Sequence, residues 1–429
     1  MTRGRPTPTA AGRPQAPVSR PRSPWPFRRL LAATTVSTLG DGIYAAALPL
    51  IAVGLTDDPA VIGLIVASPY LAWAVLGLVS GVLVDRCPRV ALMVVADVGR
   101  VVVVLATAAL LATGLLTVPL LVVMGFLLGL GQTVFDTSSQ AAVPDLVGTD
   151  PRALGTANSR ISIAQTVNTE FLGPPLGVAL FALAASAAVL GNAVSFVLSA
   201  LLLAPLLRGR SHRAATAPPG RDIARGIGAD IVSGLRFLLR HRLLLTLTLT
   251  TALVNISFAS VESLRVVYAE ERLGLGAVGF GLLFAPLAAG GLLGAVLAPA
   301  AARWLGAGRA LLSTLLVLAG ALVVLAVAGA VLPVIAAMVV GGACIAAYNV
   351  LGQTLRQAIT PPDVLGRVVA AFRMVALGAV PVGAVLGGLS ARIDLSVPYA
   401  AGAALLVATA AVVAPVVRRA NLTAPGPTE

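Results

Sequence analysis

Several long apolar runs of this sequence contain ionisable residues, and these are its first candidates for chemistry. Asp41 and Glu170 are single acids within apolar stretches, whereas Glu262 and Arg265 are spaced to pair on one face of a helix. An ionisable group at the centre of a bilayer costs at least about 2.5 kcal/mol, so each is a functional candidate by default. Carboxyl groups in such places can take up and release protons, which predicts proton coupling.

Each of these groups also has a purely structural interpretation. Asp41 can serve helix packing or conformational coupling, and Glu170 can be a neutral acid that is hydrogen-bonded to a neighbouring helix. Glu262 and Arg265 are expected to neutralise one another as a gate or strut. The residue types alone leave both interpretations open for Asp41 and Glu170.

A short charged segment, Gly81-x-x-x-Asp85-Arg86-x-x-Arg89, separates the second and third apolar runs. A connection this short can only be a tight turn between two helices, and the glycine allows those helices to approach closely. Asp85 can accept hydrogen bonds from the open N-terminus of a neighbouring helix, whose dipole favours an anion. The alternative is an ordinary charged turn.

The composition is that of a membrane protein. Of the 429 residues, 58% are hydrophobic and 11% are charged, with a mean hydropathy of +0.96, whereas a soluble protein carries roughly a quarter charged residues. The net charge of +13 does not indicate nucleic-acid binding, because the arginines are confined to the tails and to loops between apolar runs. Cys87 and Cys344 lie on different elements, so neither a disulfide scaffold nor a metal site is expected. No nucleophile–base set is visible, so neither an enzyme nor a cofactor is expected.

About 20 apolar residues cross a membrane as a helix, and the sequence offers twelve such runs. We predict spans at about 30–54, 61–83, 90–112, 117–138, 157–182, 186–207, 243–268, 277–298, 309–329, 332–354, 367–389 and 397–418. The predicted fold is an all-α membrane protein of twelve transmembrane helices in two pseudo-symmetric six-helix halves. The expected parts are a disordered basic tail at 1–29, an N-terminal half at 30–207, an Arg-rich cytoplasmic loop at 208–242, a C-terminal half at 243–418 and a tail at 419–429.

Arginines gather on one side of this predicted bundle, in the N-terminal tail, the central loop and the C-terminal end. Acids mark the opposite side: Asp57, Asp58, Glu270 and Glu271. By the positive-inside rule, both termini and the central loop are expected in the cytoplasm, with the chain crossing the cell inner (plasma) membrane many times.

The two predicted halves repeat a short pattern. Gln140-x-x-x-Pro144 after the fourth run recurs as Gln357-x-x-x-Pro361 after the tenth, at an offset of 217 residues. Parallel six-helix halves joined by a long loop are typical of transporters, in which the halves rock about a central cavity.

Several short motifs follow one another along roughly residues 28–418. Besides the segment from Gly81 to Arg89, they are Ser37-x-x-Gly40-Asp41-Gly42, Asp97-x-x-Arg100, Ala157-Asn158, Gly173-Pro174, Gln357-x-x-x-Pro361 and Gly366-Arg367-Val368. In this order they resemble the major facilitator superfamily of secondary transporters, in the branch that contains enterobactin exporters and macrolide-efflux proteins. Gly173-Pro174-Pro175-x-Gly177 resembles the Gly-Pro motif of proton-coupled drug exporters and predicts a bend in the fifth helix.

The resemblance implies a gate and a charge network. The gate would consist of Gly81, Asp85, Arg86 and Arg89. Asp85 would meet the start of the eleventh helix, joining the halves on the cytoplasmic side and stabilising the outward-open state. On the cytoplasmic side of the cavity, the charge network would comprise Asp97, Arg100 and Arg367. Asp97 and Arg100 are spaced for mutual pairing.

The resemblance also implies which helices line the cavity, namely helices one, four, seven and ten. The expected lining residues are polar or aromatic side chains on these helices: Tyr44, Gln132, Asn255, Phe258, Tyr348 and Asn349. A pocket with apolar walls, few polar groups and one or two acids suits an amphipathic or cationic substrate.

The function implied by the resemblance is secondary active efflux of small amphipathic molecules, such as drugs, antibiotics or secondary metabolites, by proton antiport. The expected partners are that substrate, the proton as coupling ion and the lipid bilayer, without nucleic acid, and the expected state is a monomer. Two alternatives remain: a lipid or lysophospholipid flippase, and a non-transporting membrane receptor or assembly factor.

Overall fold

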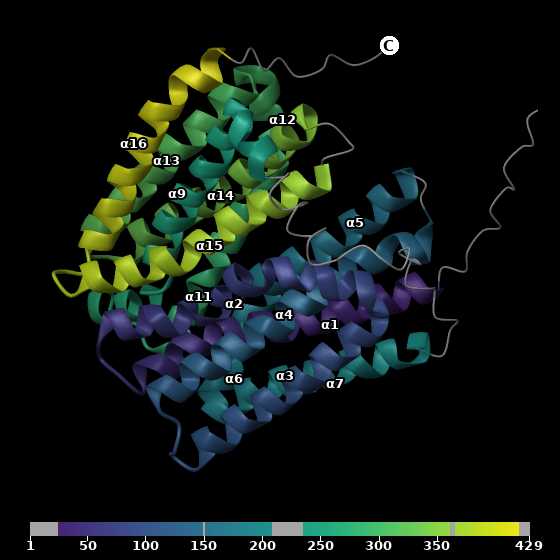
Figure 1. The fold of residues 1–429 in the computed structure, drawn as a ribbon. Helices are drawn as coiled ribbons and strands as arrows, with labels where there is room; N and C mark the ends of the chain where they lie inside the picture. Colours follow the sequence, from purple (N-terminus) through teal and green to yellow (C-terminus); the bar gives the residue numbers. More distant parts are fainter. Residues whose placement is uncertain (1–24, 149–150, 208–234, 361–364, 420–429) are drawn as a thin grey trace, which may run out of the picture.

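The computed structural model describes residues 25–148, 151–207, 235–360 and 365–419. Within these ranges the regular elements are helices, and they pack into a bundle of two halves (Figure 1). The predicted tails at 1–24 and 420–429, and most of the predicted central loop at 208–234, lie outside the described residues.

The N-terminal half consists of six spans. Five are unbroken: α1 (Trp25–Val53), α2 (Pro59–Arg86), α3 (Arg89–Ala112), α4 (Val118–Val147) and α7 (Ala185–Leu207). The fifth span in chain order is interrupted, and its parts are α5 (Pro151–Thr166), the π-helix η1 (Val167–Leu172) and α6 (Gly173–Leu183).

The C-terminal half also has six spans. The seventh span is made of α9 (Arg242–Glu262), α10 (Arg265–Val267) and the π-helix η2 (Tyr268–Arg272), and the eighth of α11 (Ala277–Leu282) and α12 (Phe284–Leu305). The last four are α13 (Ala307–Val327), α14 (Val331–Ile359), α15 (Leu365–Ala391) and α16 (Val397–Arg419).

Length and hydropathy confirm the predicted all-α membrane fold. Within the described ranges, ten helices are long and apolar enough to cross a membrane. Helix α2 and the interrupted fifth span complete the twelve spans, six in each half.

The first span begins earlier than predicted, because its leading turn is anchored. Arg29 lies 3.8 Å over the ring of Trp25 and donates a hydrogen bond to the Leu202 carbonyl at 3.4 Å. Phe27 in the same turn is buried. Residues 25–29 therefore belong to α1 rather than to a disordered tail.

The two halves meet tightly at the end of the bundle where α2 begins and α15 ends, which we term the closed end. Here a Cβ atom on Gly388 of α15 would lie 2.5 Å from the Cα of Ala60, and one on Gly63 of α2 would lie 2.5 Å from the Ala384 carbonyl oxygen. Only glycine permits this approach. Toward the other end, where α1 begins and α7 ends, the ribbons of the two halves diverge (Figure 1). We term it the arginine end.

Candidate functional site

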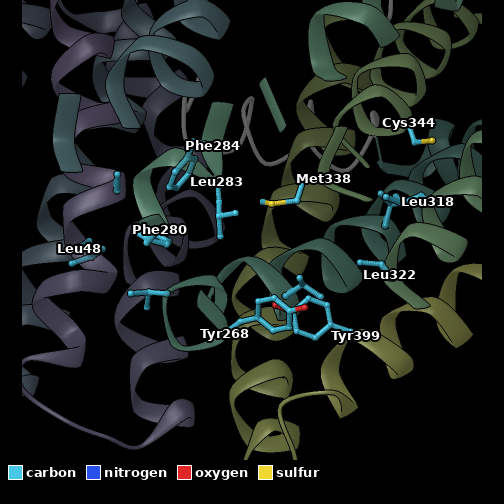
Figure 2. Close-up of a cluster of buried hydrophobic side chains, with 14 of the residues drawn as sticks. Leu48, Tyr268, Phe280, Leu283, Phe284, Leu318, Leu322, Met338, Cys344 and Tyr399 are labelled. Atoms are coloured by element: carbon cyan, nitrogen blue, oxygen red, sulfur yellow. The ribbon is translucent and has the colours of Figure 1, made fainter. Parts of the chain in front are cut away.

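A cavity of about 250 Å³ lies between the two halves. Its N-terminal wall comes from α1, α2, α4, α7 and the fifth span, and its C-terminal wall from the seventh and eighth spans. On the C-terminal wall, Phe280 and Phe284 pack edge to face with ring centroids 5.2 Å apart. In Figure 2 these rings lie between Leu48 of α1 and Met338 of α14. An apolar cavity of this size suits a small organic molecule.

Three of the predicted lining residues do line this cavity: Tyr44, Gln132 and Phe258. Trp73 and Asn192, which were not expected there, line it as well. They lie on α2 and α7, which are the second and sixth spans, whereas the expected lining residues came from the first, fourth, seventh and tenth spans. Aromatic residues make up only 4% of this chain, and this scarcity could have identified Trp73 as a candidate lining residue.

The other three predicted lining residues are used elsewhere. The Asn255 side chain donates to the Ala376 carbonyl at 2.7 Å, which ties α9 to α15. The hydroxyl groups of Tyr348 and Thr251 are hydrogen-bonded at 3.0 Å, and Asn349 is exposed. None of the three is among the residues that line this cavity.

A buried charge cluster lies beside the cavity, between α1 and α3. Arg100 is 1% exposed, and its guanidinium forms the predicted ion pair with Asp97. The same guanidinium donates to the Ser37 hydroxyl at 3.0 Å and lies 3.4 Å from a carboxylate oxygen of Asp41. One cation thus holds two helices and two acids together.

Two aromatic rings cover this guanidinium. Its Cζ lies 4.0 Å from the ring centroid of Phe196 and 4.8 Å from that of Phe135, distances at which cation–π attraction is effective. Asp41 differs from Asp97 because it also lines the cavity. The carboxyl groups of Asp41 and Asp97 share the Arg100 guanidinium. When Asp41 takes up a proton, the Asp97 carboxylate and the guanidinium form a pair without net charge.

Asp136 of α4 is a further acid, which the sequence interpretation did not single out. The side-chain amide of Gln165 in α5 donates to it at 3.4 Å. One turn further along α4, Gln140 accepts a hydrogen bond from Arg373 of α15 at 3.4 Å, a contact between the halves. The sequence feature that could have identified Asp136 is the presence of an acid inside the predicted span at 117–138.

The predicted Glu262–Arg265 ion pair forms at a break in the seventh span. Helix α9 ends at Glu262 and α10 begins at Arg265, and both side chains line the cavity. The Arg265 Cζ also lies 5.0 Å from the ring centroid of Phe284. Interrupted helices at the interface of the two halves are typical of transporter binding sites.

The fifth span changes its helical form directly before the Gly-Pro pair of the predicted bend. The π-helix η1 occupies this position, and short π-segments inside helices occur frequently at functional sites. Asn168 in η1 donates to the Thr35 carbonyl of α1 at 2.7 Å, which holds the two helices together. Glu170 belongs to η1, but its side chain lies outside the described part of the structure.

The charged segment between α2 and α3 is more helical than predicted. Helix α2 continues to Arg86 and α3 begins at Arg89, so Asp85 belongs to the last turn of α2 and only Cys87 and Pro88 form the turn. The side chains of Asp85, Arg86 and Arg367, and residues 361–364 before α15, lie outside the described part. The gate contact with the eleventh helix therefore stays a prediction.

Arg89 forms its observed contacts within the N-terminal half. Its guanidinium pairs with Asp145 at 2.6 Å and donates to the Ala141 carbonyl at 2.7 Å. Both partners lie on α4, so this side chain ties α3 to α4 at the arginine end.

An ion pair joins the halves at the closed end. Arg392, directly after α15, donates from Nε to Oδ1 of Asp58 at 3.0 Å and from Nη2 to Oδ2 at 2.5 Å. Asp58 also caps α2, because its Oδ1 accepts a hydrogen bond from the Ala60 amide at 3.0 Å. The hydrogen bonds from Arg392 hold the pKa of Asp58 below its ordinary value.

Acidifying the solution at the closed end is expected to loosen this contact. Because the pKa of Asp58 is lowered in this state, the ion pair contributes fully near neutral pH and is lost as the pH falls through the lowered value. A cysteine substituted for Phe258 on the cavity wall should then react faster with a membrane-impermeant thiol reagent below about pH 4, once its rate is divided by that of a free thiol at the same pH. This normalisation is needed because the thiolate is the reactive form and its fraction falls with pH. The acceleration should be modest, since the pair is partly exposed to solvent.

Asp58→Asn is the matched control for this pH effect. Asparagine can still cap the helix but cannot form the ion pair. The variant should react at the faster rate throughout the pH range, and a wild-type pH profile in this variant would contradict the assignment.

Comparisons with known proteins agree with the architecture. The Major Facilitator Superfamily model matches residues 30–334. An uncharacterized MFS-type transporter of Bacillus subtilis (strain 168), YfiS, is 29% identical over 388 residues, which cover 88% of this chain and 90% of the relative. An uncharacterized MFS-type transporter of Mycobacterium tuberculosis is 34% identical over 151 residues, 34% of this chain and 33% of that protein.

Solved structures share the fold over almost the whole chain. A bacterial homologue of the iron transporter ferroportin, in its inward-facing state, has a TM-score of 0.72 at 20% identity and covers 91% of this chain and 98% of that one. A bacterial homologue of the human lysosomal transporter Spinster, also inward-facing, has a TM-score of 0.68 at 17% identity and covers 92% and 96%. The twelve spans in two halves and the family match over 30–334 lead to one conclusion. The chain belongs to the Major Facilitator Superfamily and is a multi-pass membrane transporter.

Proposed function

We propose that this transporter exports small amphipathic molecules, such as drugs, antibiotics or secondary metabolites, in exchange for protons. The observation that carries the proposal is the position of Asp41. Its side chain lines the cavity between the halves and also lies 3.4 Å from the buried Arg100. A proton and a substrate can therefore act on the same group, and their mutual exclusion there is what antiport by alternating access requires.

The cavity wall supports an amphipathic substrate. Apolar and aromatic side chains dominate the lining, and Gln132 and Asn192 are among its few polar groups. Apolar pockets with a few polar groups at fixed positions bind molecules that have both apolar and polar parts. A sugar or phosphate carrier would need more polar or basic groups along its spans.

The arginine end is proposed to face the cytoplasm of the inner (plasma) membrane, with both termini on that side. Arg28 and Arg29 lie near the start of α1 there, Arg240 precedes α9, and Arg242 begins it. At the closed end, acidic residues offset the arginines: Asp57, Asp58, Glu270 and Glu271 beside Arg272 and Arg392. The excess of positive charge on one side supports this orientation. The structure then corresponds to the state that is closed toward the outside.

Export rather than import is supported by the resemblance of the motifs to the enterobactin-exporter and macrolide-efflux branch. The Gly-Pro pair after η1, which resembles that of proton-coupled drug exporters, points the same way. The family match favours a transporter over the non-transporting receptor, and the lipid flippase remains as an outcome of the experiment below.

Energised everted membrane vesicles test the proposal. Their acidic lumen should accumulate a hydrophobic dye cation or a macrolide, and an uncoupler that collapses the proton gradient should stop this accumulation. Accumulation that survives the uncoupler would rule out antiport. Accumulation of labelled lysophospholipid alone would favour a flippase, and movement of no probe would contradict export of this class of molecule.

Two acid substitutions then locate the coupling site. Asp41→Asn mimics the protonated acid, so it should abolish gradient-driven accumulation while preserving exchange of labelled for unlabelled substrate. Glu170→Gln tests the second candidate acid, in η1. If Glu170→Gln loses the gradient-driven step and Asp41→Asn keeps it, proton coupling belongs to η1 instead of α1.

A further inference from the structure

Two buried hydrogen-bonding groups at the cavity have no partner among the described residues. They are the hydroxyl of Tyr44 on α1 and Nη1 of Arg265 on α10. Both residues line the cavity, and both are more than nine-tenths buried, with 5% and 6% of their surfaces exposed. A buried polar group without a partner destabilises the folded state, so two such groups at one cavity need an explanation.

The chemistry of Arg265 narrows what can satisfy it. Its Nη2 pairs with Glu262, and its Cζ lies 5.0 Å from the ring centroid of Phe284, so the guanidinium is held from two sides. A guanidinium carries hydrogen-bond donors and no acceptor. The missing partner of Nη1 is therefore an acceptor, and the Tyr44 hydroxyl can donate to an acceptor as well.

The charge of the site indicates that this acceptor is neutral. Glu262 already neutralises Arg265, so a carboxylate or phosphate at Nη1 would add an uncompensated negative charge to an apolar cavity. A cationic group offers no acceptor to Nη1. A ketone, ester, lactone or amide oxygen accepts two hydrogen bonds and adds no net charge.

We propose that Tyr44 and Arg265 form a subsite for a neutral carbonyl oxygen on an otherwise apolar molecule. The proposal rests on the transport function above and specifies its substrate class. Phe258, Phe280 and Phe284 line the same cavity and supply an apolar surface for the remainder of the molecule. Both hydrogen-bonding groups are screened from water in this state, so a bound oxygen would supply their missing partner without competition from water.

The subsite also links the two halves. Tyr44 belongs to the N-terminal half and Arg265 to the C-terminal half, and α1 and α10 are in contact. An oxygen that bonds to both groups stabilises the state in which the closed end is closed. Substrate binding is thereby coupled to the conformation of the transporter.

Benzophenone and diphenylmethane are a matched pair of probes, because they share two phenyl rings and differ by one ketone oxygen. The chain has three tryptophans, of which Trp73 lines the cavity, whereas Trp25 and Trp304 are exposed. Trp25→Phe and Trp304→Phe leave Trp73 as the only reporter. Benzophenone binding to the purified full chain in lipid nanodiscs is measured by quenching of Trp73, and diphenylmethane by competition against benzophenone.

The wild-type chain should bind benzophenone more tightly than diphenylmethane. Tyr44→Phe removes one hydroxyl and should weaken benzophenone binding roughly two- to tenfold, the effect of one hydrogen bond, without changing diphenylmethane. The double variant E262Q/R265Q removes the guanidinium without leaving Glu262 unpaired, and it should also reduce the preference for benzophenone. Phe258→Leu is the control for the apolar wall and should weaken both probes alike.

Equal affinity of the two probes in the wild-type chain, or an equal loss of both in Tyr44→Phe, would overturn the carbonyl subsite. The vesicle experiment separates this result from the transport proposal. Gradient-driven export of a hydrophobic cation, without a preference for benzophenone, removes the subsite and keeps antiport. A preference for benzophenone without gradient-driven export keeps the subsite and removes antiport.

Discussion

Replacing Arg100 with alanine is expected to stop transport and to destabilise the folded chain by about 3–5 kcal/mol. The guanidinium is the cationic partner of Asp97, which is fully buried. Without it, Asp97 becomes a buried carboxylate with no compensating charge. Asp41, the proposed coupling group, loses the cation that lies 3.4 Å away. Stability and coupling should therefore fail together.

Two measurements separate the contributions of Arg100. Thermal unfolding of the purified chain reports stability, and gradient-driven accumulation in vesicles reports transport. The double variant D97N/R100Q removes both charges of the buried pair, so it should regain most of the stability. It should not regain transport, because Asp41 still lacks its cation. Wild-type unfolding of Arg100→Ala would show that the cluster does not stabilise the fold. Wild-type transport by the double variant would show that the cluster does not serve coupling.

The spans and the ion pairs between residues three positions apart could be predicted because their signals are local. Length and hydropathy locate helices that cross a membrane. An acid and an arginine three residues apart share a helix face, and the pairs Asp97–Arg100 and Glu262–Arg265 both form. Neither inference requires knowledge of neighbouring helices.

The rotation of each helix about its own axis could not be predicted in the same way. A helix that is apolar on all sides has no amphipathic face to indicate which residues point toward the cavity. Trp73 and Asn192 were missed for this reason. Asn255 and Tyr348 were assigned to the cavity, although each forms a hydrogen bond within the C-terminal half.

Contacts between distant parts of the chain have no local signal either. Asp58 and Arg392 are 334 residues apart, and only the packing of α2 against α15 brings them together. The break in the seventh span falls at Ser263 and Leu264, and neither glycine nor proline marks it. The contact of Arg265 with the ring of Phe284, directly after this break, has no local signal either.

Gly388→Leu is expected to shift the transporter out of the closed-end contact without unfolding it. A Cβ atom at this position of α15 would lie 2.5 Å from the Cα of Ala60 on α2, so the clash arises between the halves. Overpacking typically costs about 1–3 kcal/mol. Because the clash exists only when the closed end is closed, this cost shifts the equilibrium between the closed and the open state roughly 5- to 150-fold.

Access to the cavity from the closed end measures this shift. Replacing the two native cysteines, Cys87 and Cys344, with serine and introducing Phe258→Cys provides a single thiol on the cavity wall. Gly388→Leu should make this thiol react faster with an impermeant reagent applied at the closed end. An unchanged rate in a folded variant would mean that the α2–α15 contact does not control access.

The neighbouring glycine distinguishes conformational from structural damage. A Cβ atom on Gly387 would overlap Ser260 of α9, within the C-terminal half, so Gly387→Leu should lower the unfolding temperature instead. Gly320 on α13 has no atom within 4 Å of a Cβ position, so Gly320→Leu should change neither property. Gly387 and Gly388 differ only in the direction they face. One substitution should therefore change stability and the other access, as expected of two rigid halves that move against each other.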